Sequence, residues 1–108
     1  MPADGTILDR LYATIASRKG ADPAASYTAK LFAEGRAKIA KKVGEEAVET
    51  TLAALGEGRE RVAAESADLL YHLLVLWADC GVAPGEVWAA LEAREGRSGI
   101  EEKKSRKG

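Results

Sequence analysis

The sequence predicts an all-α protein, a bundle of four to five helices completed by a second copy of the chain. The 108 residues allow one domain. Ala, Leu and Glu dominate while β-branched residues are sparse and scattered, which favours helix over strand. Apolar residues also recur at helical spacing. A TIM barrel or a doubly wound α/β domain is excluded, because each needs a longer chain and strand-like apolar runs.

Two shorter helices are expected in the N-terminal third of the chain. The first begins after Thr6, with Asp9 three residues later as the carboxylate of a capping box. The second is predicted over residues 27–34, where Ser26 is a suitable N-cap and Gly35 a suitable stop.

Two long helices should follow and pack against each other. They are predicted over residues 36–55 and 59–80, and the short loop between them returns the second one antiparallel to the first. Gly44 interrupts the first of these patterns at an intrinsic cost of about 1 kcal/mol, which indicates close packing against a neighbour. A last helix begins at Pro84, a residue that a first helical turn accepts.

The segment 69–78 is apolar nearly all round except for His72. Such a helix needs burial on more than one side. The four or five helices of one short chain can cover only part of it. We therefore expect a homodimer in which this helix packs across the interface, the alternative being the central helix of a monomeric bundle. The folded domain is expected to span residues 1–96, and a charged, mobile tail to follow over residues 97–108.

Charge and cysteine content limit the partners and the compartment. Lys and Arg together number 16 against 17 for Asp and Glu, which argues against nucleic acid or an anionic membrane as a partner. The first 25 residues lack a signal-peptide pattern, and no apolar run reaches the length of about 18 residues that suggests a membrane span. The single cysteine, Cys80, cannot form an intrachain disulfide, so a cytoplasmic location is expected.

Two acidic motifs on the long helices are the main functional signal. A spacing of three residues puts Glu46 beside Glu49, and Glu65 beside Asp68, one turn apart on each helix. Antiparallel pairing can bring the four carboxylates together, where their repulsion needs compensation. Oxygen-only ligands suit Mg²⁺, with Mn²⁺ as a possible substitute. The alternative interpretation is that these four carboxylates are ordinary solvated charges on the helix surface and bind no metal.

Basic residues come immediately before the first acidic motif. Lys38, Lys41 and Lys42 precede Glu45 and Glu46, the reverse of the order that isolated helices prefer. Basic groups beside a metal–carboxylate cluster suit a substrate that carries several phosphates. Scattered surface charges are the alternative for each residue taken singly. The candidate substrate-binding residues are Lys30, Arg36, Lys38, Lys42, Arg97, Lys103 and Lys104.

Three further side chains near these motifs have two interpretations each. His72 lies one turn beyond Asp68, and a core histidine satisfied by a hydrogen bond is favoured over a proton relay. Tyr27 and Tyr71 are expected to serve amphipathic packing, with contact to a ligand as the alternative.

Three parts of the chain match a known family. They are SYTAKL at 26–31 with KIAKKVGEE at 38–46 and the following Glu49; ESADLLYHLL at 65–74; and RSGIEEKKSR at 97–106. Together they resemble the phosphoribosyl-ATP pyrophosphatase family of histidine biosynthesis. The paired acidic motif alone marks the wider superfamily of all-α NTP pyrophosphatases, the MazG-like proteins.

The resemblance implies a MazG-like all-α fold, usually dimeric, and Mg²⁺-dependent hydrolysis of phosphoribosyl-ATP to phosphoribosyl-AMP and pyrophosphate. It implies that the metal ligands are Glu46, Glu49, Glu65 and Asp68. The catalytic carboxylates that it implies are Glu45, Glu46 and Glu49. One alternative is a house-cleaning nucleoside triphosphate pyrophosphatase of the same fold. A non-catalytic helical dimerisation module is the less favoured alternative.

Overall fold

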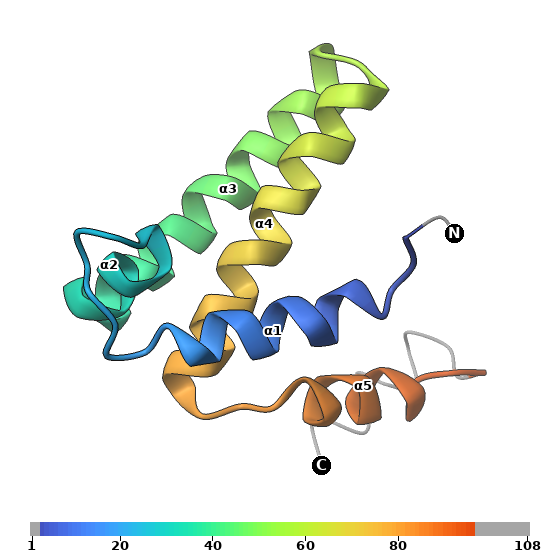
Figure 1. Cartoon of the computed structure of the whole chain (residues 1–108). Coiled ribbons are helices and arrows are strands. Elements are labelled where there is room, and N and C mark those ends of the chain that lie inside the picture. The colour runs from blue at the N-terminus through green and yellow to red at the C-terminus, as the bar shows by residue number, and fades with distance from the viewer. Residues whose placement is uncertain (1–2, 97–108) are drawn as a thin grey trace.

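The computed structural model describes residues 3–96, and helices dominate that part of the chain (Figure 1). No strand occurs within it. The prediction of an all-α bundle is therefore confirmed, and the ends of the second, third and fourth helices lie within one residue of those expected. The predicted tail at 97–108 lies outside the described residues. The helices are α1 (Ile7–Ser17), α2 (Tyr27–Glu34), α3 (Arg36–Gly56), α4 (Arg59–Cys80) and α5 (Pro84–Glu92).

The long helices α3 and α4 form an antiparallel hairpin that organises the molecule (Figure 1). Helix α1 crosses the C-terminal half of α4, and α2 packs against both α3 and α4. Gly81 ends α4 in the left-handed conformation, at φ 75°, which glycine adopts without strain. The antiparallel pairing predicted from the short 56–58 loop is thus confirmed.

Helix α5 is attached through two tryptophans. The indole nitrogen of Trp88 donates to Asp9 Oδ1 of α1 at 3.1 Å, and its ring meets Trp77 of α4 edge to face at 5.9 Å. No single described helix is long and apolar enough to cross a membrane; α4 and α5 meet that test only when joined, and they are bent by 111°.

The core lies where α1, α2 and α3 meet the second half of α4. Ile15, Leu31 and Ile39 come from the first three helices and pack with Leu74 and Val75 of α4, all of them fully buried. The apolar second half of α4, expected to pack across a dimer interface, is therefore largely covered within the chain. At the other end of the hairpin, α3 and α4 lie away from the other described helices (Figure 1), and apolar side chains there are exposed.

Two local predictions are wrong. The side chain of Thr6 does not cap α1, because its hydroxyl donates to Asp4 Oδ1 at 2.6 Å and its own N–H binds the same oxygen at 3.0 Å. A turn at Asp4 thus takes the place of the expected capping box. Gly44 is exposed, and a Cβ there would meet nothing within 4 Å. Its expected packing neighbour is therefore not found among residues 3–96.

Leu74→Ala is expected to lower the free energy of unfolding by about 2–5 kcal/mol, because truncating a fully buried leucine leaves a cavity. Urea denaturation followed by circular dichroism measures this change. Leu91→Ala, at a half-exposed position of α5, is the matched control and should cost less than about 1 kcal/mol. An equal loss in both variants would contradict this location of the core.

Candidate metal centre

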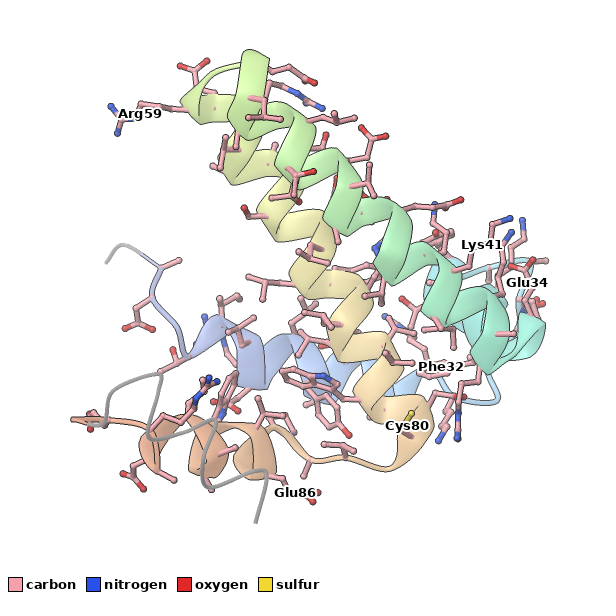
Figure 2. The ribbon with its side chains drawn as sticks, turned by 180° about the vertical axis from the view of Figure 1, so that it is seen from behind. Phe32, Glu34, Lys41, Arg59, Cys80 and Glu86 are labelled. Atoms are coloured by element: carbon pink, nitrogen blue, oxygen red, sulfur yellow. The ribbon has the colours of Figure 1, made fainter. Side chains whose placement is uncertain are left out.

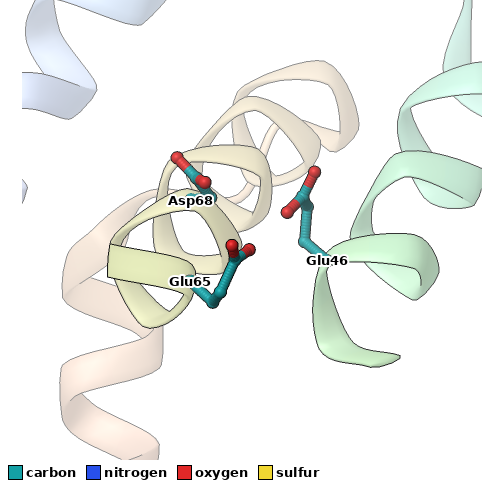
Figure 3. A group of neighbouring side chains, drawn as sticks. All are labelled: Glu46, Glu65 and Asp68. Atoms are coloured by element: carbon teal, nitrogen blue, oxygen red, sulfur yellow. The ribbon is translucent and has the colours of Figure 1, made fainter. Parts of the chain in front are cut away.

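Three carboxylates meet between the two long helices. Glu46 of α3 and both Glu65 and Asp68 of α4 each offer one oxygen, and these oxygens lie within 4.8 Å of one another. Figure 3 shows Glu46 reaching from α3 toward the two α4 side chains. The three residues are called the acidic group below. Residues of both predicted acidic motifs therefore lie close together, because the hairpin sets the middle of α3 against the first half of α4.

The acidic group is buried on one side and open on the other. Glu65 is only 7% exposed, Glu46 is half-buried and Asp68 is exposed. Oxygens that share an octahedral Mg²⁺ ion lie about 3–4 Å apart, since each Mg–O distance is about 2.1 Å. Small side-chain rotations would therefore suffice, and the open side leaves coordination positions for water or substrate. The donor set fits Mg²⁺ or Mn²⁺.

The structure does not bring every predicted carboxylate into this group. Glu49 lies on the next turn of α3 and is exposed. Three residues along a helix correspond to a rotation of 300°, so Glu49 is displaced about 60° around α3 from Glu46. Glu45 is also exposed, and its carboxylate lies 3.4 Å from Lys42 Nζ. Three of the four predicted metal ligands are thus close together.

Two cations flank the acidic group. The Arg61 guanidinium donates to Glu65 Oε1, and its Nε lies 3.5 Å from Glu57 Oε1. On the α3 side, Lys42 Nζ lies 3.8 Å from Glu46 Oε1. Arg61 is not among the residues predicted from the sequence, although its spacing of four residues from Glu65 is a signal of an ion pair. These ion pairs supply the compensation that clustered carboxylates need.

The environment of Lys42 keeps it charged. Desolvation lowers the pKa of Lys42, but nearby Tyr27 and the carboxylates of Glu45 and Glu46 together raise it above its ordinary value. A raised pKa means that the stabilising contribution is fully present below the ordinary lysine pKa and is lost only as pH rises through the raised value. Lys42 is therefore a cation throughout the neutral range.

The basic candidate Arg36 binds the end of α4. Arg36 Nε donates to Asp79 Oδ2 at 2.8 Å and its Nη2 donates to the Asp79 carbonyl at 3.0 Å, so this side chain fastens the start of α3 to the end of α4. Lys30 and Lys38 are exposed. Among the candidates within residues 3–96, Lys42 alone forms an ion pair with the acidic group. The candidates Arg97, Lys103 and Lys104 lie outside the described residues.

His72 connects the acidic group to α2. It is 6% exposed, and its Nδ1 lies 2.8 Å from the backbone oxygen of Asp68 while its Nε2 lies 3.3 Å from the hydroxyl of Tyr27. Both ring nitrogens have partners. The prediction of a core histidine satisfied by hydrogen bonds is confirmed.

Comparisons with known proteins show the family of the chain. A family profile described as phosphoribosyl-ATP pyrophosphohydrolase matches residues 8–95. The chain belongs to this family. A phosphoribosyl-ATP pyrophosphatase from Paramagnetospirillum magneticum is 68% identical over 106 residues, which cover 98% of this chain and 97% of that protein.

Two further relatives with the same name extend the match. The protein from Azospirillum brasilense is 64% identical over 94% of this chain and 91% of its own length. The protein from Rhodospirillum rubrum is 63% identical over 98% of this chain and 91% of its own length. As a member of the phosphoribosyl-ATP pyrophosphohydrolase family, the chain is a hydrolase, which excludes the non-catalytic helical module.

Arg61→Gln is expected to destabilise the protein in EDTA, because Glu65 then loses its counter-ion. A loss of about 1 kcal/mol corresponds to a fall in Tm of roughly 4–8 °C for a domain of this size. Differential scanning calorimetry measures it, and millimolar Mg²⁺ should restore most of the difference by binding the folded state.

The matched control for this variant is Lys41→Gln. Lys41 is an exposed cation of α3 and lies away from the hairpin tip (Figure 2). Its replacement should leave Tm nearly unchanged. An Arg61→Gln protein as stable as the Lys41→Gln protein in EDTA would show that Arg61 does not compensate the acidic group.

Proposed function

We propose that this chain hydrolyses phosphoribosyl-ATP to phosphoribosyl-AMP and pyrophosphate in a Mg²⁺-dependent reaction, the second step of histidine biosynthesis. The observation that carries the proposal is the meeting of Glu46, Glu65 and Asp68 beside Lys42 in a chain of this family. The relatives' names supply the substrate. We place the reaction in the cytoplasm, whose reducing conditions suit the free, exposed thiol of Cys80.

The acidic group would hold the metal ion. Glu46, Glu65 and Asp68 are its ligands in this proposal, and Glu49, one turn along α3, is the fourth carboxylate that the family pattern supplies. Mg²⁺ bound there would neutralise negative charge on the phosphoryl oxygens of the triphosphate, and Mn²⁺ could replace it. Three carboxylates against two flanking cations leave the group electronegative, which favours a divalent cation.

The remaining residues bind phosphate and handle the proton. The Lys42 ammonium, held between Glu45 and Glu46, binds oxygens of the triphosphate. Water forms a bond to phosphorus, the anhydride bond between the α and β phosphates breaks, and pyrophosphate leaves. The exposed carboxylate of Glu45 accepts the proton of the attacking water.

Asp68→Asn is expected to lower Mg²⁺-dependent pyrophosphate release from phosphoribosyl-ATP by about 100-fold or more, because a neutral amide is a poor ligand for a hard cation. A coupled pyrophosphate assay measures the rate, and circular dichroism checks the helix content. Glu60→Gln, an exposed carboxylate on the same helix, is the matched control and should keep full activity. Full activity in Asp68→Asn would contradict the metal assignment.

A substrate panel separates this proposal from its nearest rival. An acidic group beside a lysine also suits ordinary nucleoside triphosphates, so a house-cleaning NTP pyrophosphatase remains the second candidate. The panel holds phosphoribosyl-ATP, ATP and the other common nucleoside triphosphates at equal concentration. A higher kcat/KM for a common nucleoside triphosphate than for phosphoribosyl-ATP would contradict the proposed substrate and favour the house-cleaning activity.

We also propose that the chain works as a homodimer. Val48, Leu52 and Leu55 are 56%, 49% and 84% exposed at helical spacing along α3, and Leu70 of α4 is 40% exposed. The radius of gyration is 15.8 Å, larger than the value of roughly 13 Å expected for a compact domain of about 100 residues. A row of exposed apolar side chains along one helix is typical of an interface. An apolar hollow at the hairpin tip adds to it, lined by Ala54, Gly58, Arg59, Val62 and Ala63.

Leu52→Glu is expected to convert the dimer to a monomer, because it introduces a charge into the proposed interface. Size-exclusion chromatography with light scattering measures the mass at micromolar concentration. Ile7→Glu, at a similarly exposed position on α1, is the control and should stay dimeric. A wild-type chain that is monomeric at these concentrations would refute the dimer.

A further inference from the structure

Tyr27 is exposed and yet held in one orientation. It is the first residue of α2 and 51% of its surface is accessible. The side chain of Ser26 accepts the N–H of Ala29 at 3.1 Å and so fixes the start of the helix. A half-exposed ring at a helix terminus contributes little to a core, so its fixed position needs another explanation.

The first constraint on Tyr27 comes from His72. Nδ1 of His72 lies 2.8 Å from the backbone oxygen of Asp68, and a carbonyl oxygen can only accept, so Nδ1 donates. In the neutral ring Nε2 is then an acceptor, and the Tyr27 hydroxyl at 3.3 Å donates to it. The orientation of the Tyr27 ring is therefore linked to the α4 turn that carries Asp68.

The second constraint comes from Tyr71. The rings of Tyr27 and Tyr71 are stacked, with centroids 6.3 Å apart and planes at 22°. Tyr71 is itself fixed, since its hydroxyl hydrogen-bonds to Thr28 and His72 lies edge-on to its ring at 4.9 Å. One side of the Tyr27 ring thus rests on an ordered neighbour while half of its surface stays open.

These contacts connect Tyr27 to the turn of α4 that carries Asp68. His72 joins it to the backbone oxygen of Asp68, a residue of the acidic group, through the bonds at 3.3 Å and 2.8 Å. An aromatic ring whose orientation is already fixed loses little freedom when a flat ligand stacks on it. Aromatic side chains bind nucleobases in this way, since every base has a π-face.

We infer that Tyr27 is a specificity-determining residue, whose exposed ring stacks on the purine base of a nucleotide with its phosphates at Lys42 and the acidic group. His72 is a positioning residue that holds the Tyr27 hydroxyl. The inference rests on the proposed function, because it assigns a contact to the base of that substrate.

The test compares Tyr27→Leu, which removes the ring, with Tyr27→Phe, which removes only the hydroxyl. The probes are AMP, which carries the base, and inorganic pyrophosphate, which does not; both are titrated by calorimetry with Mg²⁺. Tyr27→Leu should weaken AMP binding about five- to hundredfold and leave pyrophosphate binding unchanged. It should raise KM for phosphoribosyl-ATP similarly with kcat nearly unchanged, the pattern of a contact made equally in ground and transition states. Tyr27→Phe should keep most AMP affinity.

Phe32→Leu, an aromatic replacement on the same helix, is the matched control and should bind AMP as the wild type does. An equal loss of AMP and pyrophosphate binding in Tyr27→Leu would show that the ring only supports the fold. Unchanged AMP binding in this variant would show that the ring does not stack on the base. Either result overturns the inference. A wild-type chain that binds AMP through Tyr27 but releases no pyrophosphate from phosphoribosyl-ATP would refute the proposed function and leave the base contact standing.

Discussion

Repulsion among three carboxylates that share a small volume is the constraint to which the rest of the structure is adapted. Glu65 is buried, so its charge would be costly without a partner. Arg61 reaches it from one turn before on α4, and Lys42 reaches Glu46 from one turn before on α3. Both cations precede their acids by four residues, so each long helix brings its own counter-ion, and the hairpin needs only to set the two pairs side by side.

This constraint divides the hairpin into three zones. The apolar core, centred on Leu74 and Val75, occupies the end where α1 and α2 cover α4. The acidic group begins one turn before His72, where the covering helices stop and Asp68 reaches solvent. Beyond it, toward the tip, α3 exposes Leu52 and Leu55, a surface suited to a second copy of the chain. The acidic group lies where the cover ends because a carboxylate group needs water or a cation on at least one side.

Much of the fold follows from local sequence signals. Ser26 caps α2 as expected, Gly35 ends it with φ 100°, and Gly58 and Gly81 mark the ends of α4 with φ 92° and 75°. These are local effects: a cap satisfies nearby N–H groups, and glycine tolerates a backbone that other residues avoid. The cap at Thr6 fails for an equally local reason, since the neighbouring Asp4 competes for its hydroxyl.

The sequence by itself determined the helices, the two pairs of acids one turn apart, and the resemblance that the comparisons confirmed, because all three depend on residues close together along the chain. Only the tertiary structure decided which acids meet: the rotation of α3 about its axis brings Glu46 to α4 and leaves Glu49 outside, and no spacing within one helix fixes that rotation. It also decided that Arg36 binds Asp79, 43 residues away, and that Tyr27 reaches His72, 45 residues away. Such partners are set by the packing of whole helices, which follows from the burial of many apolar side chains together rather than from any short motif.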